Sequence, residues 1–235
     1  MIHYEQMPFN SKDLEELKCL DVNFVFQPIF HAKNMEIVAY EALMRPLGKT
    51  PLELIEEYRN MNKLHVIELA TTFGAAMECK KRGCTTDICI NSFPSEALTE
   101  EQHKIYYACF PDMIGRVIVE IVEYTDLNRN RWARKKDDIQ KHHMRISIDD
   151  YSIGNNDMSA VEYYRPQYVK LDRLLVSDIH KDKERQEKIN ELIRTFHGTG
   201  IQIVAEGIET VDEFNFFRNN TDVDLLQGYY LGMPE

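Results

Sequence analysis

The chain has 235 residues, of which 29% are charged and 43% hydrophobic, so it can build one sizeable core with an ordinary soluble composition. It contains no apolar run of about eighteen residues and no signal-peptide pattern, so we expect no membrane contact and a cytoplasmic location. The net charge of −11 excludes binding of a nucleic acid polymer through a broad basic surface. The one basic run, residues 129–141, is interpreted as the solvated face of a helix.

The chain begins with a short helix and a hairpin. Residues 13–20 are expected to form the helix, with Ser11 as its N-cap. Two β-rich runs, 24–30 and 37–40, follow and are separated by about six residues. The first strand is therefore predicted to run antiparallel to the second.

From residue 52 onward, helical and apolar segments alternate. Helical periodicity is found over residues 52–58, 66–81, 100–108, 131–141, 184–197 and 210–219. The apolar runs between them predict strands over 87–90, 117–119, 145–148, 168–171, 201–204 and 223–226. Such strands are typical of a parallel sheet buried on both faces. We predict a (β/α)8 TIM-like barrel with its first strand antiparallel, formed as a single catalytic domain by residues 22–235 after an N-terminal lead over 1–21.

Polar and mostly acidic residues follow the predicted strands. They are Glu41, Asn91, Glu120, the pair Asp149 and Asp150, Lys170, Glu206 and Gln227. Enzymes of this architecture carry out their chemistry at the carboxyl ends of the strands. One polar residue at a strand end usually faces solvent, whereas a series of them in phase predicts a shared site.

Several carboxylates in one site repel one another, so either some of them are protonated or cations lie among them. Oxygen ligands without Cys or His suit Mg²⁺ or Mn²⁺. The adjacent Asp149 and Asp150 suit two bridged ions, an arrangement used for phosphodiester cleavage. The residues therefore favour metal-assisted phosphoryl chemistry. A glycosidase using Glu120 and Glu206 is the weaker alternative, because it has no use for the paired aspartates or for Lys170.

The segment from Tyr40 to Arg45, Tyr-Glu-Ala-Leu-Met-Arg, resembles the signature of the EAL-domain family of cyclic di-GMP phosphodiesterases. Further segments resemble that family in the same order: Gln27-Pro28-Ile29, Asn91, Glu120-Ile121-Val122-Glu123, Asp149-Asp150, Lys170-Leu171-Asp172, the run from Ala205 to Thr210, and the run from Gln227 to Tyr230. The resemblance covers residues 22–235. It implies hydrolysis of one phosphodiester bond of cyclic di-GMP to give linear pGpG, with two Mg²⁺ or Mn²⁺ ions.

The resemblance also implies roles for individual residues. The metal ligands it implies are Glu41, Asn91, Glu120, Asp149 and Asp150. The catalytic residues it implies are Glu41, Lys170, Glu206 and Gln227. The substrate contacts it implies are Gln27, Leu43, Arg45, Asp172, Glu209 and Tyr230. Glu123 is expected to anchor the loop after Asp150, and a homodimer is expected to form through that loop.

The loop after Asp150 departs from the family pattern. Ser152 replaces a glycine and Ile153 replaces a residue with a hydroxyl group, while Gly154 is retained. A serine restricts a backbone path that glycine allows. The sequence therefore leaves open an alternative, in which the chain is a catalytically weak or inactive EAL domain that acts as a cyclic di-GMP receptor or a protein-interaction module.

Overall fold

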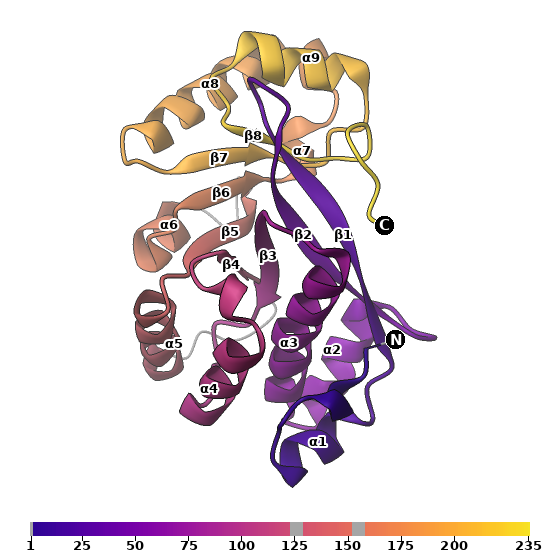
Figure 1. Ribbon diagram of the computed structural model, residues 1–235. Coiled ribbons are helices and arrows are strands. Elements are labelled where there is room, and N and C mark those ends of the chain that lie inside the picture. The colour runs from indigo at the N-terminus through magenta and orange to yellow at the C-terminus, as the bar shows by residue number, and fades with distance from the viewer. Residues whose placement is uncertain (1, 123–128, 152–157) are drawn as a thin grey trace. The chain divides into compact units, whose positions relative to one another are not determined.

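Figure 1 shows a computed structural model of the chain, which describes residues 2–122, 129–151 and 158–235. The eight strands follow one another in chain order around a closed barrel, which confirms the predicted fold class. The chain divides into two compact units. The first unit comprises Met1–Val25 and Ala42–Met144, and the second comprises Phe26–Glu41 and Arg145–Glu235.

The first unit contains a pair of parallel strands and the helices around it. The strands are β3 (Asp87–Ser92) and β4 (Val117–Ile121), and Asn91 lies opposite Glu120 in their register. The helices are α1 (Ser11–Leu17), α2 (Pro51–Asn60), α3 (Leu64–Arg82), α4 (Glu100–Cys109) and α5 (Arg129–Lys141), with the 3-10 turns η1 (Tyr4–Gln6) and η2 (Pro111–Met113). Figure 1 shows α3 running alongside β3, and the side chains along much of α3 are buried.

The start of α1 differs from the prediction. The N-cap is Asn10, whose Oδ1 accepts a hydrogen bond from the Asp13 N–H at 2.9 Å. Ser11 is therefore the first helical residue, and its prediction as the N-cap is wrong. Asn and Ser cap helices about equally well, so the sequence offered two neighbouring candidates and the structure uses the earlier one.

The second unit contains the remaining parallel strands and one end of a hairpin. The strands β5 (Arg145–Tyr151), β6 (Tyr168–Leu171), β7 (Gln202–Ala205) and β8 (Leu225–Leu226) pair in parallel in that order. The hairpin strands are β1 (Val22–His31) and β2 (Ile37–Pro46), and β1 pairs with β8 in the antiparallel direction, as predicted. The helices are α6 (Met158–Tyr164), α7 (Arg173–Val176), α8 (Lys183–His197) and α9 (Val211–Asn220), with the 3-10 turn η3 (Ile179–Lys181).

The core of the second unit lies between these strands and the helices beside them. Val169, Ile203, Phe196 and Phe217 are fully buried in it. Figure 1 shows α8 and α9 lying near β7 and β8. Among the described residues, no helix has the length and apolar character needed to cross a membrane.

Candidate active site

Lys170 is the centre of a buried charged cluster in the second unit. It belongs to β6 and is only 1% exposed. Its Nζ lies 3.1 Å from Glu41 Oε2, 3.1 Å from Asp149 Oδ1 and 2.9 Å from Glu206 Oε2. These carboxylates come from β2, from β5 and from the loop after β7. The fold thus brings together four residues that the sequence places at predicted strand ends.

Two glutamines extend this Lys170 cluster. Gln227 Nε2 donates a hydrogen bond to Glu41 Oε2 at 2.6 Å and another to Gln27 Oε1 at 3.3 Å. Gln227 is fully buried, and its Oε1 accepts no hydrogen bond from any residue in the described ranges. A buried acceptor of this kind normally binds water or a ligand. Its position beside Glu41 therefore fits a site that takes up a solvated cation or a substrate group.

The charges of the cluster do not balance within the protein, because three carboxylates surround one ammonium group. Burial raises the pKa of Glu206 to about 8, against the attraction of Lys170 and with the added repulsion of Asp149 and Glu41. Glu206 therefore holds a proton at neutral pH unless a further cation enters. Excess negative charge on oxygen ligands is the property that binds hard divalent cations.

The adjacent residues Asp149 and Asp150 lie where β5 becomes irregular. The register of β5 on β6 shifts between Ile148 and Tyr151, and Asp150 has a φ of 50°, in the left-handed region. In a regular strand neighbouring side chains face opposite sides, so an irregularity of this kind is required if both carboxylates are to serve one site, as the sequence predicts. Partial desolvation raises the pKa of Asp150 to about 6, with repulsion from Asp149 and Asp172 and attraction from Lys170.

Besides Gln27, two further predicted substrate contacts are already hydrogen-bonded or ion-paired within the protein. Asp172 Oδ1 accepts the Leu174 N–H at 2.5 Å and caps α7. Glu209 Oε2 lies 2.7 Å from Nη2 of Arg173. The sequence analysis did not single out Arg173 as a partner of Glu209. Its position directly after the Lys170-Leu171-Asp172 motif could have indicated that it lies near the site.

The remaining predicted substrate contact of this unit is Tyr230, which follows β8. It is 45% exposed, and its ring centroid lies 5.5 Å from that of Phe214. The ring therefore packs against α9 with one part and presents the other to solvent. Its role toward a substrate stays a prediction.

Other predicted site residues belong to the first unit. Glu120 is fully buried in β4 beside the partly buried Asn91 in β3. Leu43 is partly buried, and Arg45 is exposed and donates to the Met44 carbonyl at 3.0 Å. Their ligand and substrate roles stay predictions. The predictions for Glu123, Ser152, Ile153 and Gly154 concern residues outside the described ranges.

The donor atoms of the cluster decide whether a metal ion fits it. Within the described ranges, no three Asp, Glu, His or Cys side chains form a group arranged to hold a metal ion. The ammonium group of Lys170 instead lies beside Glu41 and Asp149, two of the residues that the sequence assigned to metals. The donors are nevertheless oxygens with net negative charge, and Gln227 adds an unpaired buried oxygen. This set fits a hard divalent cation.

The chain is similar in sequence to members of one family. The model of the family described as "EAL domain" matches residues 14–234. The probable cyclic di-GMP phosphodiesterase PdeD of Escherichia coli K12 is 22% identical over 228 residues, covering 88% of this chain and 40% of that protein. The cyclic di-GMP phosphodiesterase TpdA of Vibrio parahaemolyticus is 26% identical over 207 residues, covering 87% of this chain and 35% of that protein. The chain thus spans less than half the length of these curated relatives.

Solved structures show the same architecture. A standalone versatile EAL protein from Vibrio cholerae O395, solved in its c-di-GMP bound form, has a TM-score of 0.81 and 25% identity, with 92% of each chain covered. The BlrP1 protein of Klebsiella pneumoniae, solved as a manganese and cyclic di-GMP complex, has a TM-score of 0.77 and 21% identity, with 91% of this chain and 56% of that chain covered. The latter likeness supports the fold alone. Because the family model spans nearly the whole sequence, this chain belongs to the EAL domain family.

Proposed function

We propose that this chain is a divalent-metal-dependent phosphodiesterase that hydrolyses cyclic di-GMP to linear pGpG. The observation that carries the proposal is the buried Lys170 cluster, in which Glu41, Asp149 and Glu206 surround one ammonium group. The substrate follows from family membership. PdeD and TpdA are named as cyclic di-GMP phosphodiesterases, and the similar Vibrio cholerae structure is described as c-di-GMP bound.

The residues that fit Mg²⁺ or Mn²⁺ in the second unit are Glu41, Asp149 and Asp150. Asn91 and Glu120 keep the ligand role that the family resemblance implies, as a prediction. The choice of a divalent ion rests on the oxygen donors of these residues and on the family resemblance. When bound, such ions lower the pKa of water and offset the negative charge of the phosphate, and two ions suit phosphodiester cleavage.

The chain's own residues hold and move protons in this proposal. Lys170 Nζ and Glu206 Oε2 are 2.9 Å apart, a distance over which a proton can be shared. Once Glu206 has lost its proton on cation binding, its carboxylate can take the proton of the attacking water while Lys170 stays charged beside it. Glu206 can then return that proton to the leaving 3′ oxygen, because pGpG keeps its phosphate on the 5′ oxygen. Gln227 holds Glu41 through its Nε2 and leaves its Oε1 to orient water or substrate.

A product assay tests this function. The purified chain is incubated with cyclic di-GMP and Mg²⁺ or Mn²⁺, and pGpG is quantified by chromatography. Glu41→Ala removes a carboxylate of the cluster, so we expect a loss of about 100-fold or more in turnover. The matched control is Glu184→Gln, which removes a carboxylate paired with Lys188 on the exposed face of α8 and should leave turnover unchanged. Absence of pGpG with every divalent metal contradicts the proposal.

A cyclic di-GMP receptor without turnover is the second candidate. It is favoured by Lys170, which already compensates part of the carboxylate charge without a metal. Calorimetry with cyclic di-GMP distinguishes the two functions. Micromolar binding without product after prolonged incubation supports the receptor, and steady turnover excludes it.

We also propose a homodimer in the cytoplasm, as the family resemblance implies. Sedimentation velocity over a concentration series tests the oligomeric state. A species of twice the chain mass supports the dimer, and a monomer at all concentrations contradicts it.

A further inference from the structure

A buried ion pair joins α3 to α5 in the first unit. Glu68 is 5% exposed and Lys135 is 4% exposed, and Lys135 Nζ lies 2.8 Å from Glu68 Oε1. The sequence-based interpretation of residues 129–141 as a solvated helix face is therefore wrong at Lys135. Its ammonium group enters the interior because oxygen acceptors are available there.

Both side chains bind the backbone at the end of β3. Glu68 Oε1 accepts the Ser92 hydroxyl at 2.5 Å, and its Oε2 accepts the Phe93 N–H at 3.0 Å. Lys135 Nζ donates to the Phe93 carbonyl at 2.6 Å and to the Glu96 carbonyl at 2.6 Å. We call this arrangement the Glu68–Lys135 clamp. In the clamp, the Phe93 N–H is bound by the Glu68 carboxylate and the Phe93 C=O by the Lys135 ammonium group.

The clamp is poorly explained by stability alone. The desolvation of a buried ion pair offsets most of its attraction, so apolar replacements of similar size are often neutral or stabilising. In the clamp, each of the three Lys135 protons has an acceptor and Glu68 accepts from three donors. Complete pairing of this kind fixes one geometry of the surrounding backbone. The question is which geometry the clamp maintains.

Ser92 and Phe93, which the clamp contacts, directly follow Asn91. Asn91 lies opposite Glu120 in the register of β3 and β4, and the Ser92 carbonyl accepts the Val122 N–H at 3.2 Å. A displacement of this segment would move Asn91 relative to Glu120. We propose that Glu68 and Lys135 are positioning residues, which hold Asn91 beside Glu120 so that the two can bind a divalent cation together. This inference rests on the proposed function for the metal itself.

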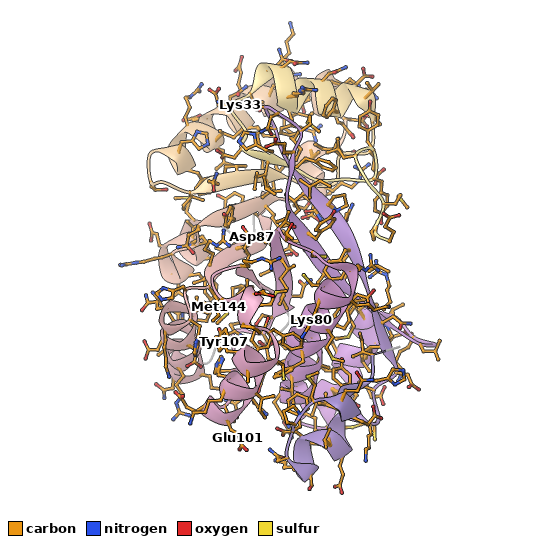
Figure 2. The ribbon with its side chains drawn as sticks, viewed as in Figure 1. Lys33, Lys80, Asp87, Glu101, Tyr107 and Met144 are labelled. Carbon is orange, nitrogen blue, oxygen red and sulfur yellow. The ribbon has the colours of Figure 1, made fainter. Side chains whose placement is uncertain are left out.

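Space beside the clamp permits a sharp test. Glu68 and Lys135 help to line a cavity of about 50 Å³, together with Tyr107 of α4 and Met144 after α5, which are labelled in Figure 2. A longer side chain at position 68 can extend into this space. Variants that change the charges without removing side-chain volume are therefore possible.

The experiment compares two double variants with the wild type. Glu68→Met with Lys135→Met removes both charges. Glu68→Lys with Lys135→Glu keeps an ion pair but reverses the charges that face the Phe93 N–H and C=O, so it cannot rebuild the clamp. The measurements are Mn²⁺ affinity by calorimetry, the Mn²⁺ concentration for half-maximal turnover, KM for cyclic di-GMP, and amide hydrogen exchange at Phe93. The control is Arg131→Met. Arg131 lies on α5 like Lys135, but it is exposed and pairs with Glu96.

In both double variants we expect Mn²⁺ affinity to fall at least tenfold and Phe93 exchange to accelerate, while KM for cyclic di-GMP changes less than twofold. The control should match the wild type. Wild-type Mn²⁺ affinity in the charge-reversed variant overturns the proposal, because a merely structural ion pair would be restored by it. If both double variants unfold, the single variant Glu68→Gln replaces them, because glutamine keeps the size of the side chain and one acceptor oxygen. Wild-type Mn²⁺ affinity in that variant, together with faster amide exchange at Phe93, also overturns the proposal.

The clamp and the proposed function can fail separately. If the wild type binds Mn²⁺ but makes no pGpG, the phosphodiesterase proposal fails and the affinity measurements still decide the clamp. If the wild type binds no Mn²⁺, the phosphodiesterase proposal fails, and so does the proposal that the clamp supports metal binding. The nuclear magnetic resonance signal of the Asn91 side-chain amide then decides the remaining part, since an unchanged signal in both double variants shows that the clamp does not position it.

Discussion

At Lys170, one ammonium group stabilises three carboxylates that come from separate segments of the chain. The desolvation of all four groups opposes this arrangement, so it persists only while the opposite charges remain close. Removing the central cation therefore leaves Glu41, Asp149 and Glu206 to repel one another. This residue couples the stability of the metal-free protein to the chemistry of the site.

Lys170→Met should lower the free energy of unfolding by about 3–5 kcal/mol at pH 8 without metal, because it leaves buried carboxylates without their partner. Addition of Mn²⁺ should restore part of the loss. Urea unfolding measures both effects. Lys141→Met is the control, since Lys141 pairs with Glu100 on the surface, where ion pairs contribute little to stability. Equal decreases in the free energy of unfolding in the two variants would show that the Lys170 cluster does not contribute this stability.

Glu206 makes metal binding depend on pH. Its pKa is raised to about 8, so the carboxyl is protonated below that pH and the proton competes with a cation. Mn²⁺ affinity should therefore rise from pH 6 to pH 8, by up to about tenfold per pH unit if one proton is released for each ion bound. Glu206→Gln should flatten this dependence. Calorimetry at pH 6, 7 and 8 measures it, and parallel slopes in both proteins contradict the assignment.

Among the elements, the strands were predicted best where they are short and apolar, as in β6. Strand β2 extends to Pro46, so the prediction that it ends at Glu41 is wrong. A rule that ends a strand at its first charged residue fails there, because Glu41 is buried and paired within the sheet. Strand β8 (Leu225–Leu226) is shorter than predicted. The side chain of Asp224, directly before it, accepts the Ile203 N–H of the neighbouring strand β7 at 2.8 Å.

The irregular end of β5 carries a prediction for Asp150. Its folded pKa of about 6 lies above the model-peptide value of 3.8, so ionisation destabilises the fold as pH rises from about 4 through 6 and remains unfavourable above. Asp150→Asn should therefore stabilise the metal-free protein at pH 8 and change it little at pH 3.5. Asp150→Ala should be less stable than Asp150→Asn by about 1 kcal/mol, because alanine tolerates the φ of 50° poorly. Urea unfolding at both pH values measures these stabilities. The prediction is contradicted if Asp150→Asn is less stable than the wild type at pH 8, or less stable than Asp150→Ala.

The loop after β7 is held by a carboxylate on α9. Glu213 is buried, its Oε1 accepts the Asp178 N–H at 2.9 Å, and its Oε2 accepts the N–H groups of Glu209 at 2.9 Å and Thr210 at 3.0 Å. Burial opposes ionisation of Glu213, but these backbone hydrogen bonds outweigh it and lower the pKa. Its contribution to stability is therefore present above the unfolded pKa and is lost as pH falls through the folded pKa.

Glu213→Gln should cost about 2 kcal/mol or more at pH 7, because the amide cannot accept all three hydrogen bonds and leaves buried N–H groups unpaired. Glu53→Gln is the matched control. Glu53 accepts a hydrogen bond from the Thr50 N–H in the exposed capping box of α2, so its replacement should cost clearly less stability than that of Glu213. Urea unfolding of both variants compares them, and a loss at position 213 no greater than that at position 53 would contradict this account.

At the scale of the whole molecule, the site depends on contacts between distant parts of the sequence. Lys170 and Glu41 are separated by 129 residues, and Gln227 and Gln27 by 200. Periodicity cannot reveal such pairs, but the predicted barrel brings strand ends together and so anticipated their convergence. The sequence placed Lys170 in the same site as the carboxylates, but it could not reveal that the ammonium group pairs directly with three of them. It also could not reveal that Lys135 is buried in a helix of mostly charged residues. Both depend on side-chain packing rather than on sequence pattern.

The central claim is that the carboxylates around Lys170 bind divalent cations beside cyclic di-GMP. Anomalous diffraction from crystals grown with Mn²⁺ and cyclic di-GMP tests it most directly. We predict manganese peaks coordinated by oxygens of Glu41 and Asp149, with a phosphate of the nucleotide as a further ligand. A bound nucleotide with no manganese at these carboxylates would contradict the claim and leave the chain a receptor.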